Sequence, residues 1–220
     1  GVDDHVADIA MDEHFARRQA HDLAPGLSAL FMLPHIPQFA GPMAGVLRAV
    51  YPCVNLYPLY TARELEHQLM DSGATAIVIL ENFAATLEQV IDRTGIKHVV
   101  VASMGDLLGF WFGRWITFAV RHLARMVPAY RLALNDGRQV TSFRQAVAQG
   151  GNVALRTVPQ SLDSVAFLQY TGGTTGLSKG AVLTHRNIVA AILQAEAWFT
   201  PALKRIGDVR KPNSLAALPL

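Results

Sequence analysis

A segment rich in glycine and threonine, placed between two short apolar runs, constrains the fold more than any other feature of this sequence. The segment covers residues 170–180, with apolar residues 165–168 before it and 181–183 after it. Glycines permit a tight loop and leave backbone N–H groups accessible, while the threonine hydroxyls and Lys179 add further donors. The pattern predicts a strand, a loop and a second strand, and the loop has the chemistry that an anionic phosphate requires. The alternative is a hairpin turn that binds nothing.

The order of residues around Lys179 excludes two common phosphate loops. A Walker A loop has glycine directly before its lysine and serine or threonine directly after it, whereas here Ser178 precedes Lys179 and Gly180 follows. A Rossmann fingerprint opens straight into a helix. In this sequence an apolar run comes first, and Thr184 is the residue that can cap the next helix. A different type of phosphate loop is therefore expected.

Residues 170–187 resemble the signature loop of the adenylate-forming enzymes, which include acyl-CoA synthetases, luciferases and peptide-synthetase adenylation domains. Residues 58–74 resemble the corresponding segment of bacterial long-chain fatty acyl-CoA synthetases, and the resemblance extends with gaps from 29 to 220. It implies a two-step reaction. A fatty carboxylate attacks the α-phosphate of ATP to give acyl adenylate and pyrophosphate, and the thiol of coenzyme A then displaces AMP.

The resemblance also implies roles for the loop. Lys179 and Thr171 are the expected catalytic residues, because donors aimed at the leaving pyrophosphate stabilise its developing charge. Mg²⁺ is expected to bridge the phosphates, and no metal-ligating residue is predicted in this chain. The residues expected to bind the nucleotide are Tyr170, Thr171, Gly172, Gly173, Thr174, Thr175, Gly176, Leu177, Ser178, Lys179, Gly180 and Ala181. Outside the loop, Val50 stands where the family pattern has glycine.

In terms of domains, residues 1–220 resemble an incomplete N-terminal AMP-binding domain whose phosphate loop is 170–181, with the C-terminal domain absent. The family's adenine segment, magnesium-binding glutamate, ribose-binding aspartate and C-terminal lysine are expected further along. The 220 residues alone are therefore predicted to be inactive as a ligase. Two alternatives stay open: an adenylate-forming ligase for medium-chain, aromatic or amino acids, and a non-catalytic nucleotide-binding or membrane-associated remnant.

Apolar runs alternate with helical patterns along the chain, which predicts an α/β fold with a doubly wound, mostly parallel sheet flanked by helices. Thr61 and Glu64 have the spacing of a capping box. Residues 134–162 are predicted to be a loop-rich connection with one helix at 142–149. The expected strands are 28–33, 51–56, 74–80, 98–101, 165–168, 181–183 and 214–220. The expected helices are 3–22, 36–50 with a break at 41–42, 61–72, 83–92, 110–127 and 185–199.

Residues 110–127 form an amphipathic pattern with aromatic residues and arginines. The pattern predicts either a surface helix that covers the core or a helix lying in a membrane interface. Arg114 and Arg121 interrupt the apolar run, so the helix is not expected to span a bilayer.

The composition fits a core-rich domain, with 51% hydrophobic and 16% charged residues. A net charge of +2 is too small to indicate a nucleic-acid partner. Cys53 is the single cysteine and is expected to be a buried small residue. The start of the sequence lacks a signal-peptide pattern. We expect a cytoplasmic protein with fatty acid and coenzyme A as partners, and leave open both peripheral attachment at the inner face of the membrane and a homodimer.

Overall fold

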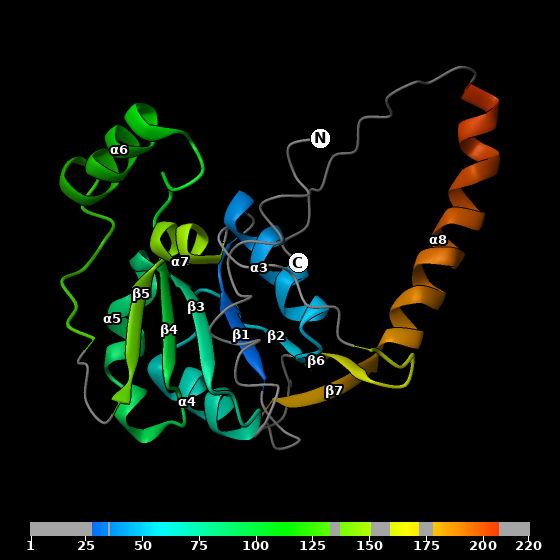
Figure 1. Ribbon diagram of the computed structural model, residues 1–220, viewed down its shortest axis with the longest axis horizontal. Helices are drawn as coiled ribbons and strands as arrows, with labels where there is room; N and C mark the ends of the chain where they lie inside the picture. The colour runs from blue at the N-terminus through cyan, green and yellow to red at the C-terminus, as the bar shows by residue number, and fades with distance from the viewer. Residues whose placement is uncertain (1–27, 35, 133–136, 151–158, 172–177, 207–220) are drawn as a thin grey trace.

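The computed structural model describes residues 28–34, 36–132, 137–150, 159–171 and 178–206. Its centre is a seven-stranded sheet in the order β5-β4-β3-β1-β2-β6-β7, flanked by helices (Figure 1). All neighbouring strands are parallel except β6 and β7. The prediction of a mostly parallel sheet flanked by helices is confirmed. The strands are β1 Ala29–Met32, β2 Cys53–Asn55, β3 Ala76–Leu80, β4 His98–Ala102, β5 Gln139–Ser142, β6 Val165–Thr171 and β7 Lys179–Thr184.

Helices cover both faces of the sheet because alternate residues of the buried strands point to opposite sides. Leu30 and Met32 of β1 face the layer that contains α4 and α5, whereas Ala29 and Phe31 face the layer that contains α3 and α7. The central strand is therefore apolar on both sides, as is typical of parallel sheets. The helices are α3 Pro37–Arg48, α4 Ala62–Asp71, α5 Ala84–Glu88, α6 Phe110–Phe118, α7 Phe143–Gly150 and α8 His185–Ile206.

Helix α4 begins at the predicted capping box. The backbone N–H of Thr61 donates to Glu64 Oε2 at 2.9 Å, and the backbone N–H of Glu64 donates to Thr61 Oγ1 at 3.4 Å. Leu65 and Leu69, one helical turn apart, are buried against the sheet. The cap sets where the helix starts, and the buried pair sets which side faces the core.

Several predicted boundaries differ from the structure. Strand β5 was missed because it is short and polar, and it lies at the edge of the sheet, where only β4 pairs with it. Helix α3 continues through Pro42, where a break was expected, and helix α8 continues through Pro201, beyond the predicted end at residue 199. The predicted helix at 83–92 is instead α5 flanked by the 3₁₀ turns Glu81–Phe83 and Ile91–Arg93. The predicted elements at 3–22 and 214–220 lie outside the described residues.

Helix α3 ends in a Schellman motif with an unusual residue. The backbone N–H of Tyr51 donates to Val46 O and that of Val50 to Leu47 O, both at 3.1 Å. The motif requires a left-handed residue, and Val50 has φ 63°. Glycine adopts this conformation freely, whereas a β-branched residue is strained there. Val50 therefore has a strained backbone at the C-terminal end of α3.

The predicted helix at 110–127 is shorter and more exposed than expected. Helix α6 is followed by a π-helical turn, Ala119–Leu123, and Arg125 has φ 49°. Helix α6 lies apart from the sheet in Figure 1, and the apolar side chains of Trp115 and Leu123 are mostly exposed. The interpretation of this segment as a cover for the core is therefore wrong. No helix in the described ranges has both the length and the apolarity needed to cross a membrane.

Candidate phosphate-binding site

The glycine- and threonine-rich segment connects the two strands of a hairpin. β6 and β7 pair antiparallel, with Tyr170 opposite Gly180 and Thr171 opposite Lys179. Ser178 directly precedes β7, and Ala181 lies within it. The predicted binding residues Gly172, Gly173, Thr174, Thr175, Gly176 and Leu177 lie outside the described residues. The structure thus defines the base of the predicted loop.

Tyr170 anchors one side of this base. Its side chain is 7% exposed, and its hydroxyl donates to Asp71 Oδ2 at 2.5 Å. Burial raises the pKa of the Tyr170 phenol, and the hydrogen bond to the Asp71 carboxylate raises this pKa further. The phenol is therefore a neutral donor that ties β6 to the C-terminal end of α4.

Gly180 lies in close contact with the Tyr170 ring. A Cβ at Gly180 would lie 3.1 Å from Tyr170 Cζ, closer than ordinary carbon contacts. The ring therefore packs directly against the backbone of β7. Gly180 was predicted to bind the nucleotide, and the structure shows that it also allows the Tyr170 ring to pack against β7.

Ser178 anchors the other side of the base through two side chains of α4. Gln68 Nε2 donates to Ser178 Oγ at 3.2 Å, and His67 Nε2 lies 3.3 Å from the Ser178 carbonyl oxygen. That contact is a hydrogen bond when Nε2 carries the imidazole proton. Gln68 is buried, so its side chain holds the serine in a defined position.

Sequence reasoning missed His67, Gln68 and Asp71 as residues of this site. They lie in the 58–74 segment, which resembles the same family as the loop, and the structure brings the two segments together. Both segments resemble the same family of enzymes, and this shared resemblance could have indicated that they lie in contact.

Lys179 lies on the exposed surface of β7. Within the described ranges no carboxylate forms an ion pair with it. The described part of the chain also has no cluster of three histidine, cysteine, aspartate or glutamate side chains that could hold a metal ion. Cys53 is buried in the core, as predicted, and burial raises the pKa of its thiol. The arrangement therefore offers an available ammonium group beside a firmly anchored hairpin.

Comparison with known proteins gives the relatives of this chain. It is 46% identical over 189 residues to a long-chain-fatty-acid–CoA ligase of Escherichia coli O157:H7, covering 84% of this chain and 32% of the relative. It is 43% identical over 203 residues to a Yersinia pestis protein of the same name, covering 92% of this chain and 34% of that protein. The chain thus spans about a third of the length of these curated relatives.

Solved structures share the fold. A long-chain-fatty-acid–CoA ligase from Archaeoglobus fulgidus matches with a TM-score of 0.58 and 22% identity, covering 89% of this chain and 31% of that chain. A carboxylic acid reductase didomain from Segniliparus rugosus, in complex with AMP, matches with a TM-score of 0.60 and 19% identity, covering 85% and 25%. The family model described as AMP-binding enzyme matches residues 13–220. The chain belongs to the AMP-binding enzyme family.

Proposed function

We propose that this chain carries the pyrophosphate-binding loop of a ligase that uses ATP to convert a long-chain fatty acid into acyl adenylate and then into acyl-CoA. The observation that carries the proposal is the joint anchoring of the hairpin to α4 by Tyr170 and Ser178, beside Lys179, with which no carboxylate of the described ranges forms an ion pair. The names of the relatives support a long-chain fatty acid as the substrate.

Lys179 and Thr171 would act on the first step. As the fatty carboxylate attacks the α-phosphate, negative charge develops on the departing pyrophosphate. A positioned ammonium and hydroxyl stabilise that charge more in the transition state than in the ground state, and this difference raises the rate. A firmly held hairpin base helps because the donors need no reorganisation during the reaction.

Mg²⁺ is proposed as the metal and coenzyme A as the acceptor in the second step. Magnesium is held in many phosphate sites by phosphate oxygens, water and few protein ligands. The hydroxyls of Thr171, Thr174 and Thr175 would donate hydrogen bonds to the phosphate oxygens.

The test is Lys179→Ala in the full-length protein. We expect pyrophosphate release with ATP and oleate to slow by about 100-fold, as when one positioned electrostatic donor is removed. Lys97→Ala is the matched control, since Lys97 is an exposed lysine beside β4, four strands from β6. A Lys179→Ala rate within a few-fold of wild type would refute the role of Lys179.

The choice of acid needs its own measurement. Comparing oleate, octanoate and benzoate in the same assay separates a long-chain ligase from the other adenylate-forming ligases. A preference for benzoate or octanoate would contradict the proposed substrate, while pyrophosphate release would still support adenylate formation.

We also infer that α6 rests on the inner face of the cell membrane. Its aromatic side chains point to solvent, and Trp111 is 83% exposed. Arg114 and Arg125 are exposed beside them and complement anionic lipid head groups. In co-sedimentation with anionic vesicles, Trp111→Ser is expected to weaken binding about tenfold. Trp198→Ser, which removes an equally exposed tryptophan from α8, is the control. Equal binding of wild type and Trp111→Ser would exclude α6 as the contact.

A further inference from the structure

A cavity of about 620 Å³ lies between α6 and the turn that follows β4. Small-molecule sites have volumes of roughly 300–1,000 Å³. Ser103 and Asp106, which line the cavity, come directly after β4, and Arg144 comes from α7 directly after β5. Open parallel sheets take ligands at the ends of strands in this way. The volume therefore falls within the range of small-molecule sites, and part of the lining follows the carboxyl ends of β4 and β5.

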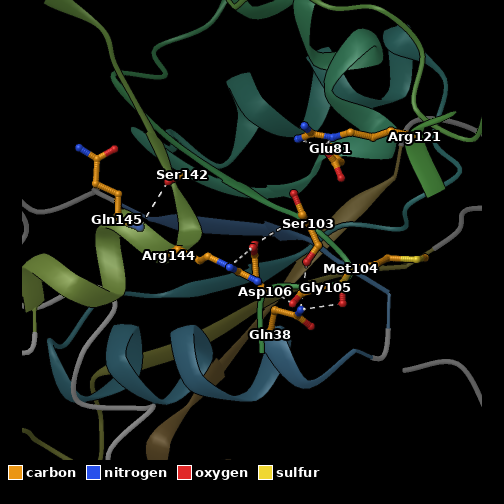
Figure 2. A network of polar contacts seen from close by, with 10 residues as sticks. All are labelled: Gln38, Glu81, Ser103, Met104, Gly105, Asp106, Arg121, Ser142, Arg144 and Gln145. Carbon is orange, nitrogen blue, oxygen red and sulfur yellow. Dashed lines mark hydrogen bonds and ion pairs between the residues drawn. The ribbon is translucent and has the colours of Figure 1, made fainter. Parts of the chain in front are cut away.

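The turn at residues 103–106 lines one side of the cavity and is held in place by hydrogen bonds. Gln38 Nε2 donates to Ser103 O at 3.1 Å, and Arg144 Nε donates to Asp106 Oδ1 at 3.0 Å (Figure 2). Arg144 Nη2 also donates to Gly105 O at 2.9 Å. The turn is thus hydrogen-bonded to both α3 and α7. This side of the cavity is therefore preorganised for a ligand.

Two glycines set the distance between the turn at residues 103–106 and α6. A Cβ at Gly105 would lie 1.9 Å from Gly113 O, and a Cβ at Gly113 would lie 2.1 Å from Gly105 O. Only glycine at both positions lets α6 come this close to the turn. The close contact fixes one end of α6 beside the cavity.

The arginines that line the cavity differ in their partners. Arg144 pairs with Asp106, and Arg121 pairs with Glu81, a carboxylate that is 1% exposed. Arg114 has no carboxylate partner in the described part of the chain, and its guanidinium lies 5.5 Å from the centre of the Phe110 ring. One positive charge at the cavity is therefore not neutralised.

The wall formed by α6 is apolar. Trp115 and Phe118 line the cavity and are more than half exposed. Covering large aromatic side chains of this kind stabilises a complex by about 1.5–3 kcal/mol each when the burial is complete. A ligand with a single negative charge and a long apolar body would neutralise Arg114 and cover these rings.

We propose that the cavity collects a long-chain carboxylate, at a place separate from the phosphate-binding hairpin. The carboxylate pairs with Arg114, and the alkyl chain lies over Trp115 and Phe118. The cavity adjoins β4, whereas the hairpin lies at the β6–β7 end of the sheet. The inference rests on the proposed function, in which a fatty acid is the substrate. It adds a second binding site for that fatty acid beside α6, the helix that we propose to lie on the membrane.

The test measures quenching of tryptophan fluorescence by 9,10-dibromostearate in the full-length protein. A non-hydrolysable oleoyl-adenylate analogue is present to occupy the catalytic site, and the ligand is kept below its aggregation concentration. Arg114→Gln is expected to weaken binding about fivefold, as for an exposed ion pair. Trp115→Ser is expected to weaken it about tenfold, and Arg114→Lys to retain most of the affinity. Matched controls are Arg93→Gln and Trp198→Ser, which change an exposed arginine and tryptophan away from the cavity.

Two results would overturn the proposal. One is unchanged binding in both Arg114→Gln and Trp115→Ser. The other is equal affinity for dibromostearyl alcohol, because the alcohol lacks the charge that Arg114 should recognise. The ligase rate of the same wild-type preparation is measured separately. A lack of pyrophosphate release would contradict the proposed function, whereas the binding result would still decide whether the cavity is a carboxylate site.

Discussion

Replacing Tyr170 by phenylalanine tests the anchoring of the β6–β7 hairpin. The change removes the hydroxyl that donates to Asp71 and keeps the buried ring. Asp71 is exposed, so its carboxylate regains water when the partner is lost. We therefore expect a loss of about 1 kcal/mol in the free energy of unfolding at pH 7, the usual net worth of a hydrogen bond.

The same substitution has a pH dependence whose sign follows from the raised pKa of Tyr170. In the unfolded chain a tyrosine ionises near pH 10, whereas the folded protein keeps this phenol protonated to higher pH. Stability from a raised pKa is fully present below about pH 10 and is lost as pH rises above it. At pH 11 the wild type should have lost about 1.4 kcal/mol through this group, while Tyr170→Phe loses nothing. The two stabilities should therefore cross between pH 10 and pH 11.

The assay is urea unfolding of both proteins at pH 7, 9, 10 and 11. The informative quantity is the difference in unfolding free energy between wild type and variant, because other titrations cancel in it. Tyr57→Phe is the control, since it removes a phenol that is half exposed, and its difference from wild type should stay within about 0.5 kcal/mol. If the Tyr170→Phe difference is the same at pH 7 and pH 11, the reasoning about this buried hydrogen bond is refuted.

Three further substitutions test other parts of the structure by urea unfolding. Gly180→Ala places a methyl group 3.1 Å from Tyr170 Cζ and should cost about 1–2 kcal/mol. Arg121→Met leaves the Glu81 carboxylate buried and without its ion-pair partner, so we expect a loss of about 3 kcal/mol at pH 7. Val50→Gly relieves about 1–2 kcal/mol of left-handed strain against about 0.5–1 kcal/mol of added chain entropy, for a net gain of roughly 0.5 kcal/mol.

Each substitution has a control in the same chain. Gly95→Ala meets its nearest atom at 3.5 Å, an ordinary contact, and should be nearly neutral. Arg93→Met breaks an exposed pair with Glu66 and should cost less than about 1 kcal/mol. Val50→Ala keeps the left-handed strain and should gain less than Val50→Gly. Equal effects within any of these pairs would contradict the corresponding structural reason.

Much of the fold was predictable because buried parallel strands are continuous apolar runs. β1 and β3 were recognised in this way, and the capping box of Thr61 marked the start of α4. β5 was not recognised, because an edge strand with polar residues lacks that pattern. The exposure of α6 could not be predicted either, since an amphipathic period shows which residues share a side but not what that side faces.

The site was predictable only in part for a similar reason. The glycines, threonines and Lys179 of the loop have a recognisable order, so the segment could be identified from local sequence. Three residues of α4 contact Ser178 and Tyr170 from about a hundred residues away in the sequence, namely His67, Gln68 and Asp71. No local sequence pattern indicates such a contact. The pKa of Tyr170 likewise depends on burial and on Asp71, which only the folded structure brings together.

The register that joins the hairpin to the sheet has a consequence for the order of folding. β6 and β7 are neighbours in sequence and can pair early, whereas β6 meets β2 through Cys53 with Phe167 and Val54 with Leu168, more than a hundred residues apart. Closing so long a loop costs more entropy than forming a hairpin, so distant pairings form late. The β6–β7 hairpin is therefore expected to dock after the strands from β1 to β4 have assembled. Substitutions at its junction with α4 should mainly speed unfolding and leave the folding rate nearly unchanged.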